Sequence, residues 1–249
     1  ASGFFADDGR PKVAIVGSGP GGAIAASRLA PHCDVALFEA GPELASREYP
    51  VDPLAGMALL FANGLLYPSK DLDLRVLQAR VVGGGSAINE GVSVRPRTST
   101  LDHWTRHGMG LEREALGQAL EAVERRQRFA PYDRARFTSA AMGLERGAPA
   151  AGLRTQILRS DIATHAHQHG DRPLPDVIGP QCLACGYCNH GCRFGHHLSV
   201  DRTYLRDAKA AGARVWANCP VERLVLSRGP GGMRVSGVML GRRKRDVVV

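Results

Sequence analysis

Residues 12–22 read KVAIVGSGPGG, and this stretch decides the fold. The apolar run of residues 12–16 predicts a short β-strand, the glycine-rich segment predicts a tight turn, and the alanine- and leucine-rich residues 23–29 predict a helix. A second apolar run, residues 34–38, predicts another strand. Strand, helix and strand within about thirty residues form a βαβ unit, whose crossover is right-handed almost without exception. We therefore expect the α/β class, with a Rossmann-type domain built on a parallel sheet.

The glycine spacing indicates a site for the ADP part of a dinucleotide. Gly17, Gly19 and Gly22 fit G-x-G-x-x-G, where the first permits the turn, the second lets the backbone approach the pyrophosphate and the third lets the helix pack on the strand. The helix N-terminus then offers N–H groups and its positive dipole end to the phosphates, with Ser18 inside the loop. Glu39 ends the second strand and is expected to accept hydrogen bonds from the ribose hydroxyls.

A second glycine-rich block, residues 80–89, reads RVVGGGSAIN. It resembles the first signature of the glucose-methanol-choline (GMC) oxidoreductase family, and the match continues through Arg95-Pro96 to Asp102 and Trp104. In that family the loop runs beside the flavin of FAD, an Asn lies close to the isoalloxazine ring, and a later residue reads the adenine through its backbone. The resemblance covers most of the chain, and it implies that FAD also contacts Arg80, Gly84, Ser86, Asn89 and Val221.

The resemblance also implies a reaction, the oxidation of an alcohol or sugar hydroxyl by hydride transfer to FAD. Ile88 stands where some members carry a His that bonds the flavin covalently, so we expect FAD to be bound non-covalently. The family's catalytic His lies in a C-terminal half that this sequence does not contain, so no catalytic residue is assigned. The sequence ends on an apolar, strand-like run, and we expect a C-terminal half of the same protein or a partner chain to complete the enzyme.

Four cysteines crowd into residues 182–192, CLACGYCNHGC. This crowding makes a tetrahedral zinc site awkward, whereas C-x₂-C-x₂-C-x₃-C copies an iron–sulfur run of ferredoxins. Cys182, Cys188 and Cys192 alone resemble the spacing by which FAD-dependent glucose dehydrogenases of the GMC family hold a three-iron cluster. That resemblance implies metal ligation by these three residues and electron transfer to an external acceptor protein. Two alternatives remain open, an oxygen-using alcohol oxidase without a cluster and a split chain that binds FAD without turnover.

The composition excludes several other classes. The formal net charge is +8, and residues 200–249 hold eleven Lys and Arg against four Asp and Glu. The basic run at residues 242–245 is expected to be a solvated turn rather than a nucleic-acid site. The most apolar stretch, residues 54–66, is shorter than the roughly twenty residues that a membrane helix needs. No nucleic-acid partner is expected, and the localisation stays open.

The order of the remaining segments predicts a discontinuous domain. Residues 1–98 and 195–249 are expected to form the FAD-binding domain, and residues 99–194 an inserted, mostly helical or irregular cap that carries the cysteines. Helices are predicted over residues 111–129 and 200–211, irregular structure over 130–180, and strands over 214–217, 221–226 and 233–240. The histidines at 165, 167, 169, 196 and 197 are interpreted as solvated loop residues.

Overall fold

The βαβ unit predicted from the first glycine motif is present in the computed structural model, which describes residues 3–6, 8–65, 68–164, 176–229, 232–241 and 245–248. Strand β1 (Lys12–Val16) leads into helix α1 (Pro20–Leu29), and strand β2 (Asp34–Phe38) pairs parallel with β1. Strand β6 (Arg214–Trp216) pairs parallel with the other edge of β2, which gives the order β1-β2-β6. Because β2 is central, all five of its residues are buried. The α/β fold class is confirmed.

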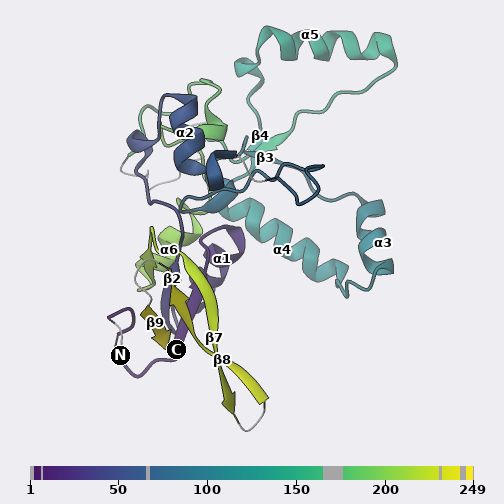
Figure 1. The fold of residues 1–249 in the computed structure, drawn as a ribbon. Coiled ribbons are helices and arrows are strands. Elements are labelled where there is room, and N and C mark those ends of the chain that lie inside the picture. The colour runs from purple at the N-terminus through teal and green to yellow at the C-terminus, as the bar shows by residue number, and fades with distance from the viewer. Residues whose placement is uncertain are drawn as a thin grey trace.

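Two hydrophobic clusters cover the two faces of the parallel sheet. On one face, α1 packs beside α6 (Tyr204–Ala210), and the small side chains of Ala23 and Ala26 let the helices approach Leu37 closely (Figure 1). On the other face, Phe38 of β2 packs on a second sheet that contains Val238. That sheet is antiparallel and has the order β7-β8-β9, with bounds Val221–Gly229, Gly232–Leu240 and Arg245–Val248.

Helices α3, α4 and α5 lie between residues 98 and 147. Figure 1 shows α4 extending outward from near α1, with α3 at its outer end, and α5 at the end of two long connections, away from the parallel sheet. A small antiparallel sheet has the order β3-β5-β4. In the chain, β3 precedes α3, β4 lies between α4 and α5, and β5 follows α5. The bounds are α2 Pro53–Leu60, α3 Thr98–Arg106, α4 Arg113–Arg126, α5 Ser139–Gly147, β3 Val92–Ser93, β4 Ala130–Pro131 and β5 Arg159–Ser160, with short 3-10 turns at Ser46–Glu48, Ala62–Leu65, Gly84–Ala87, Arg134–Arg136, Ala148–Ala151 and Cys188–His190.

Three segments differ from the sequence expectations. The region 130–180 is not wholly irregular, since it contains α5, whose first turn is capped by the Thr138 hydroxyl accepting from the Ala141 N–H group at 3.2 Å. The helix expected from residue 200 begins only at Tyr204, because the N–H groups of Arg202 and Thr203 both bond the Ser199 carbonyl in a preceding turn. The helix expected over residues 111–129 spans Arg113–Arg126.

The interpretation of two histidines as solvated was wrong. His196 and His197 are 0% and 1% exposed, because their segment pairs with residues 161–163 through backbone hydrogen bonds. The histidines at 165, 167 and 169 and the basic residues 242–244 lie outside the described residues. Within the described ranges, no helix combines the length and apolar character needed to cross a membrane. The division into a domain of residues 1–98 and 195–249 and an insertion of residues 99–194 stays a prediction.

Candidate cofactor site

The first glycine loop has the geometry that a phosphate site needs. Gly17 has φ of +87°, a conformation that favours glycine, and its N–H group donates to the Phe38 carbonyl at 2.8 Å. A Cβ on Gly22 would lie 2.0 Å from the Gly17 carbonyl oxygen, so only glycine lets α1 start this close to β1. The N-cap residue Gly19 has no capping side chain, and the first turn of α1 contains no acid. The N–H groups of that turn are therefore left for an anionic ligand.

Glu39 is tied first to the loop itself. Its side chain is 7% exposed, and Oε2 accepts from the Ser18 N–H at 2.9 Å and the Ser18 hydroxyl at 2.6 Å. Its Oε1 accepts from the Gly41 N–H at 2.8 Å. A carboxylate offers about four acceptor positions, so one position on Oε1 is left for a ribose hydroxyl. The ribose contact stays a prediction, and the structure adds a role that the sequence did not reveal, the bracing of the glycine loop.

The second glycine block lies directly against the first. Ser18 joins the two, because its hydroxyl accepts from the Gly83 N–H at 3.0 Å while donating to Glu39. A Cβ on Gly84 would lie 2.8 Å from Cα of Gly19, so the two backbones are in contact. The structure therefore brings six of the predicted cofactor residues to one place, Gly17, Ser18, Gly19, Gly22, Glu39 and Gly84.

Ser86, Arg80 and Val221 surround this centre. The Ser86 hydroxyl donates to the Gly83 carbonyl at 2.8 Å and fixes the bend of the second block. The backbone of Arg80 lies against Gly41, where a Cβ would be 2.2 Å from the Arg80 carbonyl carbon. Val221 starts β7 just after Cys219, whose N–H group donates to the Glu39 carbonyl at 2.7 Å. These contacts place the backbone of Arg80 and the start of β7 near the Glu39 end of the site, and the contacts of Arg80 and Val221 with FAD stay a prediction.

Asn89 lies apart from the phosphate end, on the wall of a cavity of about 610 Å³. Its Oδ1 accepts from the Gly91 N–H at 2.6 Å, which leaves the amide nitrogen for a ligand. Glu90, Asn189 and His190 also line this cavity and give it a polar end. The remaining wall is largely apolar. Its side chains come from α2, from the segment after α2 and from residues close to Asn89 in the sequence: Met57, Phe61, Leu65, Leu77, Ile88 and Val92.

The cysteine segment, residues 182–192, does not form a metal site in this conformation. The thiol of Cys182 is buried and accepts from the Ala184 N–H at 3.3 Å, and that of Cys192 accepts from the His196 N–H at 3.2 Å. Burial raises the pKa of Cys182, and burial together with the neighbouring thiols raises the pKa of Cys188 to about 12. Within the described ranges, no three Cys, His, Asp or Glu side chains are placed to hold one metal ion. The described cysteines therefore offer no site for a single metal ion in this conformation, and ligation of an iron–sulfur cluster by Cys182, Cys188 and Cys192 stays a prediction.

The same cysteine segment supplies two residues that the sequence analysis did not single out. Asn189 donates from Nδ2 to Glu90 Oε1 at 3.3 Å, which closes the polar end of the cavity. His190 packs on α2 at Gly56, where a Cβ would lie 3.0 Å from the imidazole Cδ2. Their position between Cys188 and Cys192 drew attention to the sulfur atoms, so no sequence signal marked them as cavity residues.

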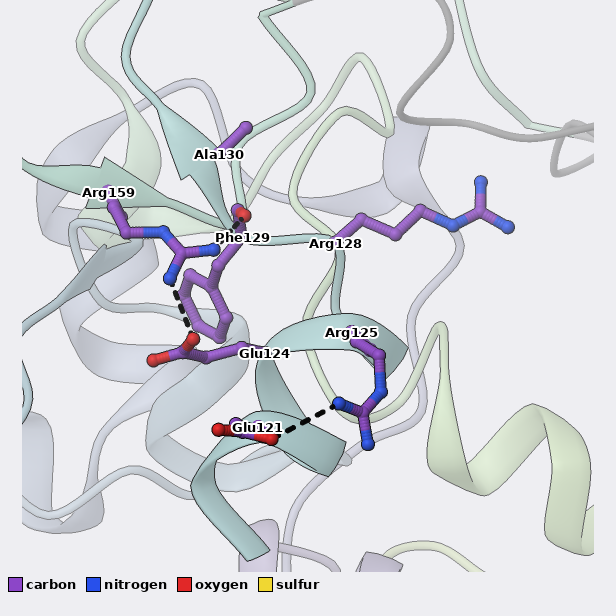
Figure 2. A pocket seen from close by; sticks show the side chains of 7 residues that line it. All are labelled: Glu121, Glu124, Arg125, Arg128, Phe129, Ala130 and Arg159. Carbon is purple, nitrogen blue, oxygen red and sulfur yellow. Dashed lines mark hydrogen bonds and ion pairs between the residues drawn. The ribbon is translucent and has the colours of Figure 1, made fainter. Parts of the chain in front are cut away.

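A second, smaller cavity of about 340 Å³ lies at the C-terminal end of α4, and none of the predicted site residues lines it (Figure 2). Figure 2 shows the Arg159 guanidinium between Glu124 and the Phe129 backbone, with donor–acceptor distances of 2.6 and 2.7 Å. Arg95 binds the same carboxylate through two hydrogen bonds, and its guanidinium lowers the pKa of Glu124. These contacts join α4 to the small sheet, and their role is structural.

Several known proteins are similar to this chain. A long-chain-alcohol oxidase of Arabidopsis thaliana is 31% identical over 236 residues, which cover 91% of this chain and 29% of the oxidase. A second long-chain-alcohol oxidase of the same plant is 29% identical over 238 residues, covering 93% of this chain and 28% of its own. An uncharacterized GMC-type oxidoreductase of Mycobacterium tuberculosis is 30% identical over 231 residues, covering 88% and 33%. The chain thus spans about three tenths of the length of these relatives.

Solved structures show the same fold at lower identity. An FAD-dependent oxidoreductase from Chaetomium thermophilum has a TM-score of 0.59 at 16% identity, covering 96% of this chain and 44% of its own. Pyridoxine 4-oxidase from Mesorbium loti has a TM-score of 0.56 at 16% identity, covering 96% and 48%.

Two family models complete the comparison, and they agree with the two glycine motifs. The NAD(P)-binding Rossmann-like domain matches residues 15–58, and the GMC oxidoreductase model matches residues 57–248. This second match covers well over half of the chain and extends from α2 to the last strand. Together with the glycine cradle and the parallel sheet, it shows that the chain belongs to the GMC oxidoreductases and carries their FAD-binding α/β domain.

Proposed function

We propose that this chain is the FAD-binding part of an alcohol oxidase whose substrates carry a long apolar chain. The observation that carries the proposal is the cavity beside Asn89. One wall contains Gly85 and Asn89 of the second glycine block, which we place beside the flavin. The other wall contains apolar side chains such as Phe61 and Leu77. A hydroxyl group at the polar end would thus lie near the flavin while the rest of the molecule is buried among apolar groups. The similarity to long-chain-alcohol oxidases supports the same substrate class.

The residues of the site have separable roles in this proposal. When bound, FAD would accept the hydride from the carbinol carbon, the hydroxyl proton would pass to a base that is not assigned in this chain, and molecular oxygen would take up two electrons and two protons to give hydrogen peroxide. The first turn of α1 holds the pyrophosphate, and Glu39 holds the ribose. Asn89 donates from its amide nitrogen at the polar end, and His190 limits the space there. Ile88 has no nucleophile to offer the flavin ring, so FAD is held non-covalently.

Oxygen is proposed as the acceptor because two of the proteins that match most of this chain are long-chain-alcohol oxidases. An iron–sulfur relay needs thiolates that bind the metal, whereas the thiols of Cys182 and Cys192 here accept backbone N–H groups. The rival function is a dehydrogenase that passes electrons to an external acceptor protein and also takes sugars. The two functions differ in substrate polarity and in the electron acceptor, so one set of measurements separates them.

The test measures the binding of alcohols of different chain length to the FAD-loaded protein. The change in the absorption spectrum of the bound flavin reports the binding. Each buried methylene stabilises a complex by about 0.8 kcal/mol, so four more methylenes lower the Kd of an alcohol by more than about a hundredfold. Leu77→Ser should weaken this dependence, whereas Leu54→Ser should not, because Leu77 lines the cavity and Leu54, which is similarly exposed, does not. Glucose binding as tightly as decanol would overturn the substrate class. Turnover with a dye but without oxygen consumption would favour the dehydrogenase.

A further inference from the structure

A buried pair of ionisable side chains lies next to Gly91, two residues after the second glycine block, residues 80–89. Nε2 of His197 lies 3.2 Å from Oδ1 of Asp161, and the two side chains are 1% and 4% exposed. Oδ2 of Asp161 accepts from the Gln127 amide at 3.3 Å. Within the described part of the chain, Nδ1 and Nε2 of His197 and Oδ1 of Asp161 are all buried without a hydrogen-bond partner, so the 3.2 Å contact is a close approach and not a hydrogen bond. A buried polar atom without a partner is costly, so this pair calls for an explanation beyond packing.

The pair is connected to Asn89 by a short series of contacts. The Asp161 N–H donates to the Gly91 carbonyl at 3.1 Å, and the Gly91 N–H donates to Asn89 Oδ1 at 2.6 Å. Gly91 has φ of +65°, and a Cβ there would lie 2.8 Å from Asp161 Oδ1. The carboxylate therefore sits directly behind the bend that sets the orientation of Asn89. A shift of the carboxylate would move Gly91 and then Asn89.

The other end of the loop has a similar support. A Cβ on Gly83, which has φ of +94°, would lie 2.7 Å from Asp201 Oδ1, and this oxygen accepts from the Ser199 hydroxyl at 2.5 Å. Removal from solvent raises the pKa of Asp201, whereas the Ser199 hydroxyl and the charges of Arg202 and His197 lower it. A carboxylate oxygen thus lies close to each of these two glycines.

From this arrangement we infer that His197 is a positioning residue, which orients the Asp161 carboxylate and through it holds Gly91 and Asn89 at the cavity. The backbone already joins the two segments, since the Leu198 N–H donates to the Asp161 carbonyl at 2.9 Å. The imidazole is therefore not needed to pair the segments. What it adds is a ring nitrogen 3.2 Å from one carboxylate oxygen. The inference rests on the proposed function only in placing Asn89 beside the flavin.

The first test measures hydrogen exchange of the Gly91 amide in the FAD-free protein, which requires no substrate and no turnover. His197→Leu removes the imidazole beside Asp161, and Gly91 exchange should become about tenfold faster, the equivalent of one lost hydrogen bond. His197→Gln retains an amide donor and should recover part of the protection. The matched control is Asp34→Asn, because Asp34 is a buried acid paired with Arg214 at the start of β2, the opposite end of that strand from Glu39.

The second test uses the FAD-loaded variants and the flavin itself as the probe. His197→Leu should shift the visible absorption spectrum or the midpoint potential of bound FAD, and Asp34→Asn should lower only the melting temperature. If His197→Leu and Asp34→Asn gave the same exchange rate of the Gly91 amide and the same flavin spectrum, His197 would be a packing residue and the inference would be overturned. If His197→Leu does not fold, Asp161→Asn and His197→Gln give the same comparison. Failure of alcohols to bind would refute the proposed function while leaving the exchange result intact.

Discussion

Replacing Glu39 by Gln separates cofactor binding from support of the glycine loop. The carboxylate accepts three hydrogen bonds, two from Ser18 and one from the Gly41 N–H. With the amide oxygen turned toward Ser18, two of these bonds persist, and the amide nitrogen faces the Gly41 N–H. One buried N–H group is then without an acceptor, which costs about 1–3 kcal/mol. Glu39→Ala would lose all three bonds and about 3–9 kcal/mol on the same scale, a large part of the stability of a typical domain.

The two losses are measured separately. The melting temperature of the FAD-free variant reports the support of the loop, and titration of that protein with FAD, followed by quenching of flavin fluorescence, reports cofactor binding. We expect Glu39→Gln to raise the Kd for FAD about tenfold, or 1.4 kcal/mol, because the ribose loses a charged acceptor. A lower melting temperature with an unchanged Kd would refute the ribose contact and leave Glu39 as a loop residue alone.

Three further predictions follow from other parts of the molecule. Gly22→Ala should prevent FAD binding and lower the melting temperature, because its Cβ would lie 2.0 Å from the Gly17 carbonyl oxygen; Gly21→Ala, whose Cβ would meet no atom within 4 Å, should leave the melting temperature of the FAD-free protein unchanged. Burial opposes ionisation of Asp176, but hydrogen bonds from Arg202 dominate and hold the pKa of this carboxyl well below its usual value, so the pair contributes stability above the carboxyl's unfolded-state pKa and loses it as pH falls toward the folded-state value. Arg202→Met should therefore reduce the free energy of unfolding by about 2–3 kcal/mol at pH 7 and flatten its acid dependence in urea titrations. Protein purified without oxygen should contain FAD and no stoichiometric iron or sulfide, and iron equal to the flavin content would restore the cluster.

The first forty residues could be interpreted from sequence because each element there is specified locally. The apolar runs, the glycine spacing and the terminal acid all agree on one βαβ unit, and Gly22 has a steric role that follows directly from helix–strand packing. The second glycine block was found by resemblance rather than by physical derivation. Its contact with the first block, through Ser18 and Gly83, depends on tertiary packing that no local pattern specifies.

The errors arose where residue type and environment disagree. His196 and His197 stand beside polar residues in the sequence, and their burial results from pairing with residues 161–163, more than thirty positions away. Helix α5 was missed because Ser139–Gly147 is short and contains two glycines, and its cap at Thr138 becomes informative only once the helix is known. Long-range pairing of this kind has no periodic signature that a sequence window can detect.

For the cysteine segment, residues 182–192, the sequence resemblance predicts metal ligation, whereas the structure places two of its other residues at the cavity. Its spacing suggested that the sulfur atoms carry the chemistry, whereas in the structure two of them accept backbone N–H groups and none forms part of a metal-binding group among the described residues. The residues between them, Asn189 and His190, form the polar end of the cavity beside Asn89. A loop of tight turns, with φ of +75° at Gly186 and +86° at Gly191, is what brings both side chains there. Serine in place of the cysteines should therefore change alcohol binding only where it alters this loop, and His190→Ala should change it directly.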